Sequence, residues 1–159
     1  MISNDKLYDY LTKFGIGSKT GSGLPGESRG ILPKVADWSG TTAPTVAFGQ
    51  GYSVTAMQAT SVFATIANDG VRVSPTVIAG TSDSSGNYTP SATRESVRVI
   101  SPETASQMRL MMESVVSASG TAPSAAIPGY RVAGKTGTAQ RIDDTCGCYR
   151  GYTASFIGF

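Results

Sequence analysis

Apolar residues at three- and four-residue spacing predict two helices in the first half of the chain. The first covers residues 6–14, with Ser3 or Asn4 as its N-cap. The second covers residues 55–68, with Ser53 as a candidate N-cap and a glycine just beyond its end. Its apolar side comprises Met57, Val62, Phe63 and Ile66.

The clearest helix follows Ser101, because this serine suits the N-cap, Pro102 the first helical position and Glu103 the first turn. Apolar side chains then repeat at helical spacing at Met108, Met111, Met112 and Val115. Such a methionine stripe is typical of core packing. The helical parts of the fold are therefore predicted at about residues 1–70 and 101–116.

Extended segments occur in two places. Residues 71–79 and 97–100 predict strands joined by a turn-rich segment, and residues 130–140 and 152–159 predict two more, separated by a polar loop. Residues 18–49 are dense in Gly, Pro, Ser and Thr and predict a long irregular connection.

The composition excludes several classes of catalytic site and binding partner. The 159 residues include no histidine, which excludes triads and zinc sites built on imidazole. Only 15% of residues are charged and no basic tract occurs, so we expect no nucleic-acid partner. No apolar run reaches the length of a membrane span, and the first residues do not resemble a signal peptide. Any anchor is therefore expected outside this chain.

The two cysteines, Cys146 and Cys148, flank a single glycine. A disulfide between them would close a loop of three residues, too small to staple a fold. Two thiols without histidine also make a poor zinc site. We expect free or locally oxidised thiols in a loop, and no metal.

Residues 129–136 match the phosphate-loop pattern G-x-x-x-x-G-K-[ST]. That motif works between a strand and a helix whose N-terminal amides hold the phosphates. Here residues 130–132 are strand formers, and Gly137 and Thr138 follow, so no helix is expected to begin at Lys135. Nucleotide binding is therefore the minor alternative, and titration with ATP and Mg²⁺ should show no saturable binding.

A second interpretation places residues 135–138 (Lys-Thr-Gly-Thr) on an edge strand, whose free N–H and C=O groups accept an extended peptide as a further strand. Gly137 has no side chain, so the peptide can approach the backbone. Alternation puts Thr136 and Thr138 on one face, where hydroxyls can bind a terminal carboxylate, and Lys135 on the other. The Thr138 N–H is a candidate oxyanion-hole donor.

The same strand carries a family resemblance. Residues 128–140 (Pro-Gly-Tyr-Arg-Val-Ala-Gly-Lys-Thr-Gly-Thr-Ala-Gln) resemble the K-T-G strand of class B penicillin-binding proteins. Residues 23–27, 47–55 and 64–71 follow the order seen in division-type transpeptidases, and residues 146–149 resemble the actinobacterial branch. The resemblance implies a partial β-lactamase/transpeptidase-like α+β fold, with helices packed on an antiparallel sheet that is incomplete in this chain.

Residues 3–6 and 85–87 match the family's other two motifs, S-x-x-K with the acylated serine and S-x-N. We reject both. The first lies beside a helix that in the family follows S-x-N, and the second lies in a turn-rich hairpin too close to Lys135. The nucleophile is therefore expected outside this chain, and residues 1–159 are expected to be a fragment of one transpeptidase domain, with the K-T-G strand and its successor at about 130–159.

The resemblance implies a peptidoglycan D,D-transpeptidase of cell division that acts on stem peptides ending in D-Ala-D-Ala and is acylated by β-lactams. Lys135 and Thr138 are the implied catalytic residues, the first in the proton network and the second through its N–H. Thr136, Gly137 and Thr138 are implied to bind the substrate, and Gln140 to line the acceptor side. No metal or organic cofactor is implied. The membrane-anchored parent is expected at the extracytoplasmic face, and this chain is expected to be soluble.

The chain by itself is expected to be inactive and to take no covalent label from a fluorescent penicillin. The alternative function is a non-catalytic folded fragment or peptide-recognition module, which would bind a D-Ala-D-Ala peptide without hydrolysing it. In the family that the chain resembles, the strand after K-T-G pairs with a further C-terminal strand, so ending at Phe159 is expected to expose a second strand edge. We therefore expect self-association through that edge or a companion fragment.

Overall fold

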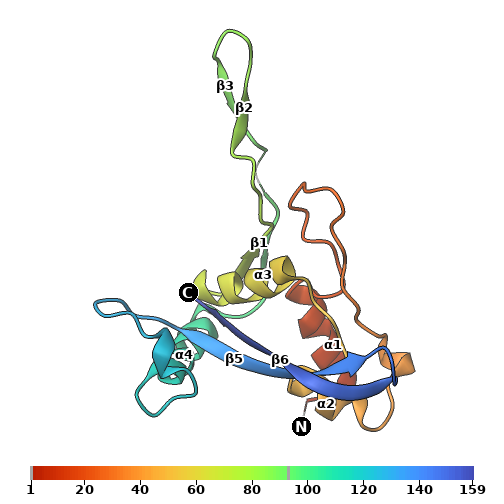
Figure 1. The fold of residues 1–159 in the computed structure, drawn as a ribbon. Helices are drawn as coiled ribbons and strands as arrows, with labels where there is room; N and C mark the ends of the chain where they lie inside the picture. The colour runs from red at the N-terminus through yellow and green to blue at the C-terminus, as the bar shows by residue number, and fades with distance from the viewer. Residues whose placement is uncertain (1, 93) are drawn as a thin grey trace.

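The computed structural model describes residues 2–92 and 94–159 (Figure 1). Its helical elements are α1 (Asn4–Lys13), η1 (Val35–Asp37), α2 (Thr42–Ala47), α3 (Ala56–Ala67), α4 (Pro102–Glu113), η2 (Ser114–Val116) and η3 (Pro123–Ala125). Its strands are β1 (Val71–Val73), β2 (Gly80–Ser82), β3 (Tyr88–Pro90), β4 (Ser96–Arg98), β5 (Gly134–Asp143) and β6 (Cys148–Gly158). The strands form three antiparallel ribbons, β1–β4, β2–β3 and β5–β6. The predicted α+β class is confirmed, and the antiparallel sheet is present as small pieces.

Side-chain caps determine where α1 and α3 begin. Ser3 Oγ accepts a hydrogen bond from Lys6 N at 3.3 Å, which confirms Ser3 as the N-cap of α1. The N-cap of α3 is Thr55, and the prediction of Ser53 is wrong. The reason is Gln58, three residues after Thr55: Gln58 N donates to Thr55 Oγ1 at 3.1 Å, and Thr55 N donates to Gln58 Oε1 at 2.8 Å.

Gln58 also fixes the irregular connection that precedes α3. Its side chain is 1% exposed, and its Nε2 donates to the carbonyls of Ser18 at 2.8 Å and Arg29 at 2.9 Å. Ser61 and Thr65 are buried on the same helix, so its buried side is partly polar rather than apolar as predicted. The burial of Gln58 and Thr65 is tolerated because both side chains are hydrogen-bonded, and Thr65 Oγ1 donates to the Ser61 carbonyl at 2.7 Å. The connection also contains η1 and α2, which its composition did not indicate.

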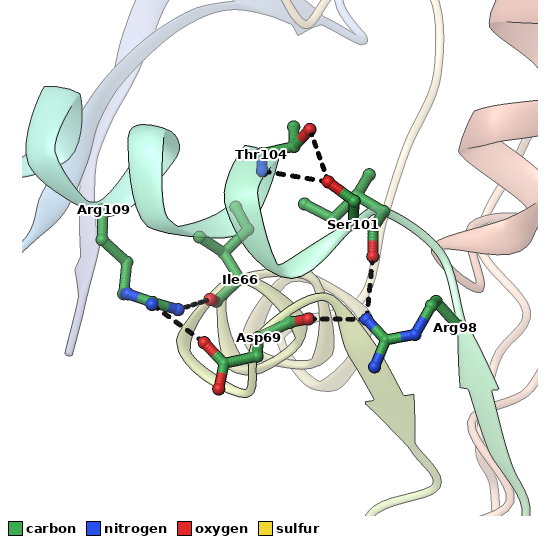
Figure 2. Close-up of polar contacts among 7 residues, drawn as sticks. Ile66, Asp69, Arg98, Ser101, Thr104 and Arg109 are labelled. Atoms are coloured by element: carbon green, nitrogen blue, oxygen red, sulfur yellow. Dashed lines mark hydrogen bonds and ion pairs between the residues drawn. The ribbon is translucent and has the colours of Figure 1, made fainter.

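Two arginines hold the C-terminal end of α3 against β4 and α4 (Figure 2). Arg109 in α4 donates to the Ile66 carbonyl at 2.9 Å and pairs with the Asp69 carboxylate at 2.8 Å. Arg98 in β4 donates to the Asp69 carbonyl at 2.9 Å. Cations at this end of a helix offset the negative end of its dipole. Asp69 has a φ of 49°, so this cluster also stabilises a left-handed turn from α3 into β1.

The core lies between α3, α4 and the start of β5. Its buried members are Ile66, Met112 and Ala133, and Phe63 and Met108 pack against them. The predicted stripe on α4 is therefore correct for Met108 and Met112, whereas Met111 is 58% exposed and points away from the core. Ala133 directly precedes β5, so the core fixes the point at which this strand begins.

The β2–β3 hairpin projects from the body of the molecule (Figure 1). The strand predicted over residues 71–79 is short, because β1 ends after three residues and an irregular link leads to β2. At the tip, Asp83 Oδ1 accepts hydrogen bonds from the backbone N–H groups of Ser85 and Asn87, both at 2.9 Å. These bonds give the turn its shape, as is typical of an Asx turn.

Candidate functional site

The Lys-Thr-Gly-Thr segment, residues 135–138, lies near the start of β5. This strand begins at Gly134, four residues later than predicted, because Tyr130 N donates to Ile127 O in a turn with Gly129 at a φ of 84°. At the other end, β5 and β6 extend through most of the polar loop that was predicted between them. The result is one long hairpin.

The ladder between β5 and β6 determines which backbone groups are paired. Ala133 and Phe159 exchange two N–H···O bonds of 2.8 and 2.9 Å at one end of this ladder. Facing residues in an antiparallel ladder alternate between hydrogen-bonded and non-hydrogen-bonded pairs. The register continues regularly from there, so Lys135 and Gly137 occupy hydrogen-bonded positions and direct their backbone groups to β6.

Thr136 and Thr138 occupy the alternate positions, where N–H and C=O point away from β6. In the part of the chain that the structure describes, β5 pairs with β6 alone. The outward backbone groups of both threonines therefore lie on an open strand edge. This is the geometry that the addition of an extended peptide requires.

An ammonium group and two hydroxyls gather at this open edge. Lys135 Nζ donates to the Thr136 carbonyl at 2.8 Å and lies 3.5 Å from Thr136 Oγ1. Thr136 Oγ1 lies 3.1 Å from Thr121 Oγ1. Alternation predicts Lys135 on the other face, but its long side chain curls back to the strand edge. Positive charge and hydroxyl donors together suit a carboxylate.

Thr121 is the neighbour that the sequence did not indicate. It lies in a segment of small residues without apolar periodicity, fifteen positions before Thr136. The fold brings the two together because η2 packs against β5. A lone threonine in such a segment carries no signal of its own, so its position could be found only from the structure.

Two glycines allow β5 to lie close to β6. A Cβ atom at Gly134 would lie 2.3 Å from Phe156 Cζ and 2.9 Å from the Ile157 carbonyl, so a side chain is excluded there. A Cβ atom at Gly137 would lie 2.6 Å from Ser155 Oγ, a contact that rotation of the serine can relieve. Close approach of a ligand to Gly137 remains a prediction, and packing against β6 is an additional reason for glycine.

A β-bulge ends the regular part of the edge. The register shifts between Gln140 and Ile142, and Gly151 in β6 adopts a φ of 79° at this point. Thr138 and Gln140 are both exposed. The regular edge thus runs from Gly134 to Gln140 and includes every site residue predicted from the sequence.

The competing motifs have other structural roles. Ser3 caps α1 through its hydroxyl oxygen. Residues 85–87 form part of the tip of the β2–β3 hairpin, remote from β5 (Figure 1). Lys135 lies within a strand, so no helix N-terminus is present there to hold phosphates, and the phosphate-loop interpretation is excluded.

One ionisable group on β5 with a shifted pKa lies away from the open edge. At the far end of β5, the Thr145 N–H donates to the Asp143 carboxylate at 2.8 Å and lowers the pKa of that group.

Within residues 2–92 and 94–159, no group of three His, Cys, Asp or Glu side chains could hold a metal ion. Among the described residues, none of the helices combines the length and the hydrophobicity of a membrane span. The described part of the edge carries one ammonium, hydroxyls and backbone amides.

Known proteins share both the sequence and the fold. The chain is 47% identical over 154 residues to penicillin-binding protein PbpB of Mycolicibacterium smegmatis, which covers 93% of this chain and 24% of that protein. It is 37% identical over 136 residues to the peptidoglycan D,D-transpeptidase FtsI of Escherichia coli, covering 86% of this chain and 21% of that protein. The chain therefore spans about a quarter of the length of these relatives.

A solved structure matches over the same region. The crystal structure of penicillin-binding protein 3 from Mycobacterium tuberculosis, complexed with ampicillin, superposes with a TM-score of 0.95 at 44% identity, covering 99% of this chain and 36% of that one. The family model described as the penicillin binding protein transpeptidase domain matches residues 1–159. The chain belongs to the penicillin-binding protein transpeptidase family.

Proposed function

We propose that this chain is the substrate-binding portion of a peptidoglycan D,D-transpeptidase domain. The observation that carries the proposal is the open edge of β5, where Thr136 and Thr138 direct their backbone groups away from β6. The names of the relatives, among them a peptidoglycan D,D-transpeptidase, support the reaction class. Residues 1–159 are then part of one domain, and the remainder lies in the longer protein.

In this proposal the end of a stem peptide lies along β5 as an additional strand. Lys135 and the hydroxyls of Thr136 and Thr138 bind the carboxylate of the terminal D-Ala through charge-assisted hydrogen bonds. Lys135 already lies beside the Thr136 hydroxyl, so little rearrangement of its ammonium is needed. Gly137 keeps the backbone accessible, and Gln140 lines the side of the site that the acceptor stem peptide enters.

The reaction itself needs a serine from the rest of the domain. Its Oγ attacks the carbonyl carbon of the penultimate D-Ala, the terminal D-Ala leaves as its amine takes up a proton, and an amine of a neighbouring stem then displaces the serine. The Thr138 N–H, which points outward, stabilises the developing oxyanion. Lys135 supplies charge to the proton network. A β-lactam acylates the same serine, because its ring amide takes the place of the scissile peptide.

In this proposal the nucleophile lies outside this chain, and the structural roles of the two serine motifs within it support that part of the proposal. Ser3 Oγ accepts from Lys6 N, and Ser85 lies in a hairpin turn. The longer protein would act at the extracytoplasmic face of the membrane, where its peptidoglycan substrate is assembled. The isolated chain keeps the open edge, so D,D-peptide binding without chemistry is the second candidate function.

Labelling with a fluorescent penicillin tests the proposal. The full-length protein should form one covalent adduct, whereas the isolated chain should form none; intact mass would confirm both results. A stoichiometric adduct at Ser3 of the isolated chain would contradict the placement of the nucleophile. Failure of the full-length protein to react would contradict the assignment as a penicillin-reactive transpeptidase.

A further inference from the structure

The turn between β5 and β6 contains a disulfide bond between Cys146 and Cys148. Both cysteines and the glycine between them are exposed to solvent. The bond lies at the far end of the hairpin, beyond the bulge after Gln140 and away from the proposed substrate edge. An exposed disulfide outside the core is accessible to thiols in solution.

Other interactions hold this turn without help from the disulfide. The Asp143 carbonyl accepts from the N–H groups of Cys146 at 3.3 Å and Gly147 at 2.8 Å. The Asp143 carboxylate accepts from Thr145 N at 2.8 Å. Asp143 and Cys148 are also the last facing pair of the ladder. The turn is therefore defined by its backbone hydrogen bonds, and we expect it to keep this shape when the sulfurs are reduced.

The loop that the disulfide closes is also very small. Its two cysteines are separated by two positions in the sequence. In the chain-entropy account, a disulfide stabilises a fold by restricting the unfolded chain, and the shortest loops contribute least. Exposed disulfides with little structural role are the readily reduced ones, in contrast to buried structural bridges.

We propose that Cys146–Cys148 is a reversible thiol–disulfide exchange site that reacts with dithiols while the protein stays folded. A thiolate of the dithiol attacks one sulfur, breaks the Cys146–Cys148 bond and forms a mixed disulfide. The second thiol of the reagent, as its thiolate, then displaces the protein sulfur. Two electrons pass to the protein, both cysteines become thiols by taking up protons, and the dithiol leaves as a cyclic disulfide.

Trypsin provides a direct readout, because cleavage after Arg141 and Arg150 releases one peptide, residues 142–150, that contains both cysteines. The folded full-length protein is treated with dithiothreitol, quenched in acid, and labelled with N-ethylmaleimide at both thiols. We expect the reduction rate of the native protein to lie within about tenfold of the rate in denaturant. Labelling that occurs only after denaturation would overturn the proposal.

A second measurement separates an exchange site from a structural bridge. The Cys146→Ser/Cys148→Ser double variant and the reduced protein should both acylate with a fluorescent penicillin within about twofold of the oxidised protein, because the open edge of β5 lies beyond the bulge. Loss of acylation on reduction and in the double variant would show that the bridge is structural and contradict the proposal. This comparison uses relative rates, so a protein that never reacts with penicillin would affect the proposed function alone, since the alkylation readout stands independently.

Discussion

The two hairpins of this molecule have the same topology and different surroundings. The β2–β3 hairpin projects into solvent and depends on its own ladder and its Asp83 turn (Figure 1). The β5–β6 hairpin contacts α3, α4 and η2, and it begins directly after Ala133 of the core. An antiparallel ribbon by itself is marginally stable. The candidate chemistry therefore lies on the ribbon whose root is fixed by packing, and one edge of that ribbon is open among the described residues.

Removing the positive charge at the open edge should lower acylation more than any other change proposed for this molecule. Lys135→Met in the full-length protein should lower the second-order rate of acylation by a fluorescent penicillin by about 100-fold or more, because the carboxylate loses its cation and the proton network its ammonium. Lys19→Met, at an exposed loop position, is the matched control and should leave the rate unchanged. Equal acylation rates in the two variants would contradict the assignment of Lys135 to the site.

A matched pair of glycine substitutions compares the two hairpins directly. Gly134→Ala should destabilise the protein by about 1–3 kcal/mol and reduce acylation about tenfold, because its Cβ meets the Phe156 ring and a backbone carbonyl. Gly80→Ala meets a similar obstruction, with its Cβ 2.5 Å from the Thr89 carbonyl, but in β2–β3. It should disturb that hairpin and leave acylation unchanged. Loss of acylation in both variants would show that the two ribbons are coupled.

Substitutions of Asp69, at the C-terminal end of α3, test how much its ion pair and its left-handed turn contribute to the stability of the fold. Asp69→Ala removes the partner of Arg109 and places alanine at a φ of 49°, so it should lower the free energy of unfolding by about 1–2 kcal/mol. Asp69→Gly removes the same carboxylate but suits the backbone, so it should cost less. Chemical denaturation of both variants measures the difference. A larger cost for glycine would contradict the role assigned to the left-handed turn.

The smallest effect is a pH dependence confined to β2–β3. Hydrogen bonds from Asn87 and neighbouring amides lower the pKa of Asp83 below its ordinary value of 3.8. The ionised carboxylate therefore stabilises the turn above that pH, and this contribution is lost as the pH falls through the lowered pKa. Amide NMR signals of Ser85 and Asn87 should report opening of the turn in acid. Asp83→Asn should remove this titration, and an unchanged titration in that variant would assign it to another group.

The sequence was most informative where local rules determine structure. Ser101 and Pro102 predicted the start of α4, and the K-T-G segment predicted a strand rather than a phosphate loop. Local rules failed where tertiary contacts decide. The buried side of α3 was expected to be apolar, but it contains the amide of Gln58. This amide is buried because three backbone carbonyls, distant in sequence, accept hydrogen bonds from it. Thr121 joined the site through the packing of η2, for which no spacing in the sequence gives a signal.

Amide hydrogen exchange along β5 of the full-length protein shows directly whether the outer edge of this strand binds the substrate. We expect the amides of Lys135 and Gly137 to exchange slowly at all times, because they donate to β6. The amides of Thr136 and Thr138 should exchange quickly in the free protein and slow markedly once a β-lactam occupies the open edge. Slow exchange of both threonines in the free protein, or no change on acylation, would contradict the assignment of this edge as the substrate-binding strand.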